Sequence, residues 1–173
     1  IFFDDYLFPK IGNFGLLTKI HSLESMTTQT SIGIKGNFVY SSPELLKNNE
    51  YSKSNDVYAF SLIVYEIMTL ETPFLKFHNF NMIYKEVVER NKRPKFNVNI
   101  ENCYKKLIEK CWSENPKDRP TFDDIKYALI NPESGFITKN INEELYYNYV
   151  YSIENSEKEF DYSNNYKIKF DAF

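Results

Sequence analysis

Two histidines and two cysteines are present among the 173 residues, and these side chains are common zinc ligands or nucleophiles. His21 and His78 are isolated, with no cysteine or carboxylate cluster at ligand spacing, so we interpret both as surface residues. Cys103 and Cys111 are eight positions apart and have no base nearby, and such cysteines more often pack in a core. These four residues therefore predict neither a metal site nor a cysteine nucleophile.

The composition sets limits on the class of protein. The chain is 42% hydrophobic and 17% aromatic, which is enough apolar material for a folded core. A net charge of -3 gives no indication of a nucleic-acid partner or of a polybasic membrane surface. Two cysteines are too few for a disulfide framework, so we expect a reducing compartment and a cytoplasmic location.

No stretch of the sequence predicts a membrane span or a signal peptide. The longest apolar run, from Phe60 to Met68, is interrupted by Glu66. The chain opens at Ile1 within an apolar run, without a methionine, which suggests a fragment. Residues 131–173 hold 8 acidic and 4 basic residues, so this tail differs in charge from the rest.

Elements that could position functional residues follow from the hydrophobic periods. Apolar residues on both sides of Asp4 and Asp5 predict a β-hairpin over residues 1–11, with the Asp pair in the turn. From Leu16 to about Tyr40 no period is sustained and Ser and Thr are dense, so we expect a long functional or disordered loop. Ser54 is the expected N-cap of a helix that is apolar on most sides and ends near Leu70, which indicates a central core position.

Four shorter helices are predicted after this central one. They cover Met82 to Arg90, Tyr104 to Trp112, a segment capped by Thr121, and a short tail helix whose apolar residues run from Ile141 to Ile153. Asn140 and Glu143 are placed as a capping box for the tail helix. The fold class is therefore mostly α, with a small hairpin at the N-terminal end.

Four motifs in one order then point to a family. Asn13-Phe14-Gly15 stands where protein kinases have Asp-Phe-Gly, and Gly36 to Glu44 (GNFVYSSPE) resembles their G-T-x-x-Y-x-A-P-E segment. Asp56 to Ser61 (DVYAFS) resembles the D-V-Y-S-F-G opening of the buried central helix. Leu107 to Phe122 (LIEKCWSENPKDRPTF) resembles the C-W-x-x-x-P-x-x-R-P-x-F stretch near the end of the kinase fold. The set resembles the C-terminal lobe of a eukaryotic protein kinase of the tyrosine-kinase-like group, with serine/threonine substrates.

This resemblance implies a domain organisation. Residues 1–130 would form a partial kinase domain that starts after the catalytic loop, and residues 131–173 an acidic extension. The glycine-rich loop, the β3 Lys, the αC Glu and the His-Arg-Asp catalytic loop precede this region in the family. The resemblance therefore places no catalytic residue within the chain and implies a missing N-terminal lobe.

Asn13 is the main departure from the family pattern. The family's Asp ligates the Mg²⁺ that bridges the ATP phosphates, and Mg²⁺ prefers a charged carboxylate. Asn offers a neutral oxygen, so the resemblance implies a degenerate metal site at Asn13, with Phe14 and Gly15 completing the cofactor-binding motif. A turn after the hairpin is the alternative interpretation of these three residues. ATP and Mg²⁺ are thus expected for the parent family, but not for this chain alone.

Further positions take on expected roles through the resemblance. The hydroxyl-rich loop aligns with the activation segment, where added phosphate could pair with Arg; a solvated linker is the alternative. Asn37 stands where serine/threonine kinases have a Thr that contacts the catalytic Asp. This departure weakens the case for kinase activity. The candidate residues are Thr27, Thr28, Thr30 and Ser31 for phosphorylation, and Gly36, Asn37 and Tyr40 for substrate docking. Loop and core packing is the alternative for Gly36 and Tyr40.

Structural roles are implied for Pro43, Glu44, Asp56 and Arg119. Glu44 and Arg119 resemble the family's ion pair between the end of the activation segment and the late helices; two exposed charges are the alternative. Asp56 resembles the buried Asp that accepts backbone N–H groups of the catalytic loop; an ordinary first-turn Asp is its alternative.

Two functions remain open at this stage, beside a truncated product with no function. The chain could belong to a kinase that transfers the ATP γ-phosphate to protein serine and threonine, in which case we expect this chain alone to be inactive. Asn13 also allows a pseudokinase, in which the helical lobe is a docking module. Either function implies protein substrates or protein partners.

Overall fold

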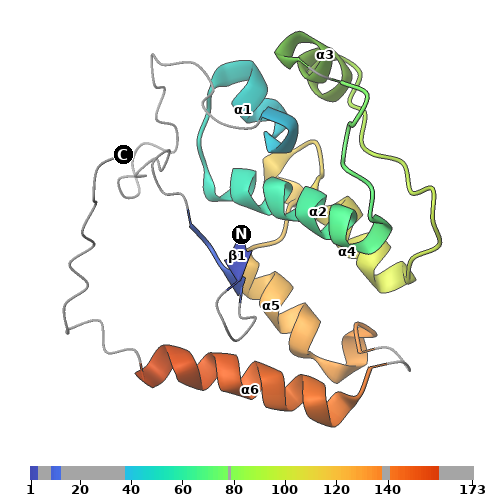
Figure 1. The fold of residues 1–173 in the computed structure, drawn as a ribbon. Coiled ribbons are helices and arrows are strands. Elements are labelled where there is room, and N and C mark those ends of the chain that lie inside the picture. Colours follow the sequence, from blue (N-terminus) through green and yellow to red (C-terminus); the bar gives the residue numbers. More distant parts are fainter. Residues whose placement is uncertain (4–8, 13–37, 78, 138–140, 160–173) are drawn as a thin grey trace. The chain divides into compact units, whose positions relative to one another are not determined.

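The computed structural model describes residues 1–3, 9–12, 38–77, 79–137 and 141–159 (Figure 1). Helices dominate these residues, which confirms the mostly α fold class. The chain divides into two compact units, residues 1–125 and residues 126–173. In the part that the structure describes, no helix combines the length and apolar character needed to cross a membrane.

The first residues form a two-stranded antiparallel sheet. Strand β1 is Phe2–Phe3 and strand β2 is Pro9–Lys10, with Phe2 opposite Lys10 and Phe3 opposite Pro9. Pro9 opens its strand, a position where its missing N–H is tolerated. The expected turn at Asp4 and Asp5 lies outside the described residues.

Helix α2, Lys53–Thr69, is the central helix that the apolar pattern predicts. Its N-cap is Ser52 and not Ser54, because the side-chain oxygen of Asn55 accepts a hydrogen bond from the Ser52 backbone N–H. The helix ends one residue before Leu70, whose left-handed backbone (φ 57°) accompanies an N–H bond to the Glu66 carbonyl. The helix therefore ends at Thr69 and does not extend to Thr72-Pro73, whose proline would also have stopped it.

The core of the first unit forms around α2. Helix α4, Asn102–Cys111, contacts α2 directly. The buried cluster joins aromatic and aliphatic side chains from five elements or their ends, and Tyr65 stacks at an angle with Trp112 at a centroid distance of 6.2 Å. Its members are Leu46, Tyr58, Leu62, Tyr65, Ile83, Val87, Ile108 and Trp112.

Helix α1, Pro43–Asn48, is one that the hydrophobic pattern did not predict. Pro43 stands in the first turn, where a missing N–H costs nothing, and Glu44 lies beside it in the same turn. Asn49 ends the helix in the left-handed conformation, with φ 57°. A short 3₁₀ turn, Phe38–Tyr40, precedes α1.

The predicted helix from Met82 to Arg90 is divided in the structure. Helix α3 covers Phe80–Tyr84, and a π-helical turn continues it over Lys85–Glu89. It begins earlier than predicted because the Asn79 side chain accepts a bond of 3.0 Å from the Met82 backbone N–H.

Helix α5, Phe122–Ile130, begins at the predicted cap: Thr121 and Asp124 exchange side-chain and backbone hydrogen bonds of 2.9 and 3.1 Å. Short 3₁₀ turns precede and follow it, at Pro116–Asp118 and Pro132–Ser134. Asn142 caps the tail helix α6, Glu143–Glu159, through a bond of 3.1 Å from Leu145. The tail helix is longer than the short helix that the sequence predicted, because its polar residues extend it beyond Ile153.

Candidate functional site

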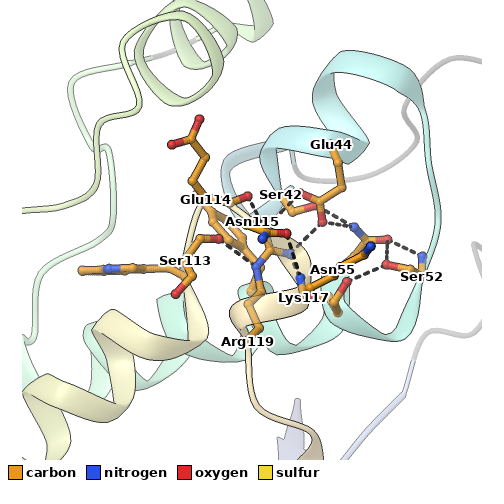
Figure 2. A network of polar contacts seen from close by, with 12 residues as sticks. Ser42, Glu44, Ser52, Asn55, Ser113, Glu114, Asn115, Lys117 and Arg119 are labelled. Atoms are coloured by element: carbon orange, nitrogen blue, oxygen red, sulfur yellow. Dashed lines mark hydrogen bonds and ion pairs between the residues drawn. The ribbon is translucent and has the colours of Figure 1, made fainter.

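The most highly connected polar group of the first unit is the Arg119 guanidinium (Figure 2). Its Nη1 lies 2.7 Å from Oε1 of Glu44 and its Nη2 lies 2.9 Å from Oε2, so the two side chains form a bidentate ion pair. The Arg119 side chain is fully buried and that of Glu44 is 13% exposed. Burial of both charges makes this pair a structural link between α1 and the loop before α5.

Backbone carbonyls complete the surroundings of Arg119. Its Nε donates to the Ser113 carbonyl at 2.9 Å, and Nη1 also donates to the Ser54 carbonyl at 3.0 Å. A longer bond of 3.4 Å joins Nη2 to the Glu114 carbonyl. A buried guanidinium needs such acceptors for its five N–H groups, and here they come from α2 and from the loop after α4.

Asn55 extends the network toward Ser42. The Asn55 amide nitrogen donates to Oε1 of Glu44 at 2.6 Å and to the Ser42 hydroxyl at 2.7 Å. Ser42 is completely buried. The amide thus satisfies two buried acceptors at once, while its oxygen caps α2 through Ser52 (Figure 2).

The Tyr58 ring lies close to two arginine side chains. Its ring centroid is 5.1 Å from the Arg119 guanidinium carbon and 5.4 Å from that of Arg93. Burial raises the pKa of Tyr58 to about 12, against the opposing effect of the two arginines. Its hydroxyl has no hydrogen-bond partner among the residues that the structure describes.

The electrostatics of Glu44 follow from this geometry. Burial alone would raise its pKa, but the hydrogen bonds and the charge of Arg119 outweigh burial and hold the pKa of Glu44 below its usual 4.5. The carboxylate is therefore ionised near neutral pH. An ionised, fully engaged carboxylate is suited to fixing two chain segments together and not to taking up a proton in catalysis.

Tyr40 forms a second link to the central helix. Its hydroxyl donates to Oε2 of Glu66 at 2.9 Å. Burial, with the hydrogen bond and charge of Glu66, raises the pKa of Tyr40 to about 12. The end of the 3₁₀ turn is thereby tied to α2 at a point two turns beyond Tyr58.

Asp56 is one of the residues for which the resemblance implied a structural role. It lies in the first turn of α2, where an acidic residue is favoured by the helix dipole, and its side chain is exposed. Partial desolvation raises its pKa. This position fits an ordinary first-turn Asp, and the implied contact with backbone N–H groups of the catalytic loop stays a prediction, because that loop precedes this region in the family.

The remaining predicted positions lie outside the described residues. These are the metal-site motif Asn13, Phe14 and Gly15, the hydroxyl candidates Thr27, Thr28, Thr30 and Ser31, and the docking candidates Gly36 and Asn37, together with His21 and His78. Within the described ranges, no group of three or more His, Cys, Asp and Glu residues could hold a metal ion.

Sequence reasoning missed Asn55 and Ser42. The signal for Asn55 was present: an amide three positions after Ser52 matches the spacing of a capping box. Ser42 gave no such signal, because a serine before a Pro-Glu pair can be exposed as readily as buried. Its partner, Asn55, is separated from it by 13 positions.

Comparison with known proteins identifies the family of this chain. A family model described as protein tyrosine and serine/threonine kinase matches residues 1–129. The dual specificity protein kinase shkE of Dictyostelium discoideum is 32% identical over 120 residues, which are 69% of this chain and 17% of that protein. The probable serine/threonine-protein kinase drkC of the same organism is 32% identical over 127 residues, 73% of this chain and 16% of that protein.

The probable serine/threonine-protein kinase roco8, also from Dictyostelium discoideum, is 34% identical over 121 residues, 69% of this chain and 6% of that protein. This chain thus spans less than a fifth of the length of these three relatives. The match of the family model covers most of the chain, including Glu44, Asn55 and Arg119. The chain therefore belongs to the protein tyrosine and serine/threonine kinase family.

Proposed function

We propose that this chain forms the substrate-side lobe of a kinase that transfers the ATP γ-phosphate to serine and threonine residues of proteins. The observation that carries the proposal is the buried Glu44–Arg119 pair, within a family match over residues 1–129. The pair fixes α1 against the helical core, and the resemblance assigns the residues before α1 to the activation segment and the substrate-docking surface. The relatives named as serine/threonine or dual specificity kinases support the choice of phosphate acceptor.

The chain alone is not expected to transfer phosphate. Asn13 offers a neutral oxygen where Mg²⁺ prefers a carboxylate, so the donor set at this position does not fit the family's metal site. ATP binding, the catalytic base and the phosphate-binding loop would depend on segments N-terminal to residue 1. The two cysteines are compatible with a cytoplasmic location, which is part of this proposal.

A second candidate function is a pseudokinase that binds protein partners without catalysis. Asn13 is the observation that favours it, since loss of one aligned electrostatic contact to the transition state costs roughly 100- to 1000-fold in rate. In this function the described helical lobe, with α1, α2 and α4, would be the docking module.

Phosphotransfer by the full-length product of the transcript distinguishes the two functions. The first step is to read the sequence upstream of Ile1, where the kinase proposal requires a glycine-rich loop, a Lys on the third strand and a His-Arg-Asp motif. Incorporation of labelled phosphate from ATP into serine or threonine is then compared between the natural protein and Asn13→Asp, with Asn99→Asp as the matched control. Asn99 is exposed and has no described interaction.

A weak kinase gains about 100-fold or more in rate through Asn13→Asp and nothing through Asn99→Asp. If neither the natural protein nor Asn13→Asp incorporates phosphate although the upstream motifs are complete, the kinase proposal is overturned and the pseudokinase takes its place. Absence of the upstream motifs would overturn it as well.

A further inference from the structure

A groove of about 660 Å³ opens where two loops of the first unit meet. One loop, residues 70–77, follows the end of α2, and the other, residues 92–97, precedes α4. Both loops can be followed in Figure 1, the first between α2 and α3 and the second between α3 and α4. We call this feature the loop groove.

Hydrogen bonds join the two loops to each other and to the Tyr65 side chain of α2. The Tyr65 hydroxyl lies 3.0 Å from the Lys95 carbonyl and 3.2 Å from Oε2 of Glu71, and the Asn97 side chain donates to the same Glu71 oxygen at 3.1 Å. Leu70 and Phe74 have left-handed backbone conformations, with φ 57° and 56°. Residues other than glycine adopt this conformation only uncommonly. The groove is therefore a preformed feature of the fold.

Apolar side chains line part of the groove and stand exposed at its edge. Leu70 is 90% exposed and Leu75 is 69% exposed, and the rings of Phe74 and Phe77 lie 6.1 Å apart beside them. Adjacent exposed apolar residues of this size in a concave site are typical of a binding surface.

The charge of the groove is strongly positive. Its lining includes Lys76, Lys92, Arg93 and Lys95 but a single carboxylate, Glu71, in a chain whose net charge is -3. Lys92 pairs with Glu86 outside the groove, and Arg93 donates to the Trp112 carbonyl. Lys76 and Lys95 are exposed and have no acidic partner in the part of the chain that the structure describes.

We propose that the loop groove docks an acidic segment of a partner protein. An apolar side chain of that segment, such as Leu or Phe, packs against Leu75 and Phe74, and flanking Asp or Glu residues meet Lys76 and Lys95. Charge complementarity favours this occupant, because the two lysines have no acidic partner among the described residues and exposed apolar side chains line the same groove. The docking requires no phosphotransfer, so it is independent of the proposed catalytic function.

A peptide-display selection against the immobilised 173-residue chain tests the proposal. Random decapeptides are selected in parallel on the natural chain, on Lys76→Glu/Lys95→Glu, and on Lys85→Glu/Lys106→Glu. The last variant is the matched control, because Lys85 and Lys106 are exposed and lie outside the groove. Enrichment of acidic sequences around one Leu, Phe or Tyr is expected on the natural chain and on the control, and is expected to be lost on the groove variant.

The affinities of the variants for the most enriched peptide then separate the contribution of charge to binding from that of apolar contacts. By fluorescence anisotropy, Lys76→Glu/Lys95→Glu is expected to weaken binding about tenfold or more, and Leu75→Ser by about tenfold. Ile67→Ser is the control for Leu75→Ser, since Ile67 is also exposed, at 64%, and does not line the groove. Unchanged thermal unfolding of all the variants verifies that they are folded.

The proposal is overturned if the selection yields no acidic consensus, or if the groove variants bind the selected peptide as well as their controls do. Binding of anionic phosphatidylserine vesicles without selection of any peptide would also overturn it, since the groove would then serve a lipid surface.

Discussion

Glu44 and Arg119 are 75 positions apart in the sequence and meet through two hydrogen bonds of 2.7 and 2.9 Å. Glu44 is the second residue of α1, and Arg119 lies in the loop that leads to α5. Because both side chains are largely withdrawn from water, the pair couples the folding of these two segments.

Removal of one charge from this pair should destabilise the protein strongly. Glu44→Gln leaves the buried Arg119 guanidinium without its counter-charge, and the free energy of unfolding is expected to fall by about 3–5 kcal/mol in urea denaturation. Glu109→Gln, an exposed site with no described interaction, is the control and is expected to change stability by less than about 0.5 kcal/mol.

The double variant Glu44→Gln/Arg119→Met measures the interaction free energy between the two side chains. It should lose less stability than the sum of the two single variants, because it leaves no uncompensated buried charge. Strict additivity would show that the two side chains act independently, contrary to their geometry.

The contribution of Glu44 to the free energy of unfolding should decrease as the pH falls. Its folded-state pKa is lowered, so the unfolded chain takes up the proton more readily than the folded chain. The stability difference between the natural protein and Glu44→Gln is therefore fully present above the usual value of 4.5 and is lost as the pH falls through the lowered folded pKa. Urea unfolding of both proteins from about pH 7 to about pH 3 measures it, and a difference that grows in acid would contradict the assignment.

Asn55→Asp should destabilise the network by electrostatic repulsion. The amide nitrogen of Asn55 is 2.6 Å from a Glu44 oxygen, and a carboxylate oxygen in its place would put two negative charges in contact. The expected decrease in the free energy of unfolding exceeds that for Asn55→Ala, which is about 1–3 kcal/mol because buried groups are left unsatisfied. Part of the loss at Asn55→Asp should be recovered near pH 5, where the two carboxyls can share a proton.

The two cysteines should react at very different rates. Burial raises the pKa of Cys111 to about 12, against the opposing charge of Arg119, while Cys103 is partly exposed. Iodoacetamide at about pH 8 should therefore label Cys103 alone in the folded protein and both residues in urea. Mass spectrometry counts the labels, and Cys103→Ser should abolish labelling of the folded form; rapid labelling of this variant would show that Cys111 is accessible.

Much of the local structure was determined by the sequence itself. The continuous apolar pattern of α2, the Thr121 cap of α5 and the antiparallel hairpin all depend on residues within one helical turn or one strand pair of each other. The kinase motifs added the pairing of Glu44 with Arg119 as an expectation, which periodicity alone could not provide.

Tertiary structure decided the features that depend on distant partners. Asn55 bridges Glu44 and Ser42 because α1 packs next to the start of α2, and Asp56 is exposed although its neighbours Asn55 and Val57 are buried. The loop groove exists because Tyr65 brings together Glu71 and Lys95, which are separated by a whole helix in the sequence. Such contacts arise when elements pack against one another, and no local pattern of residue types encodes which distant group will be the partner.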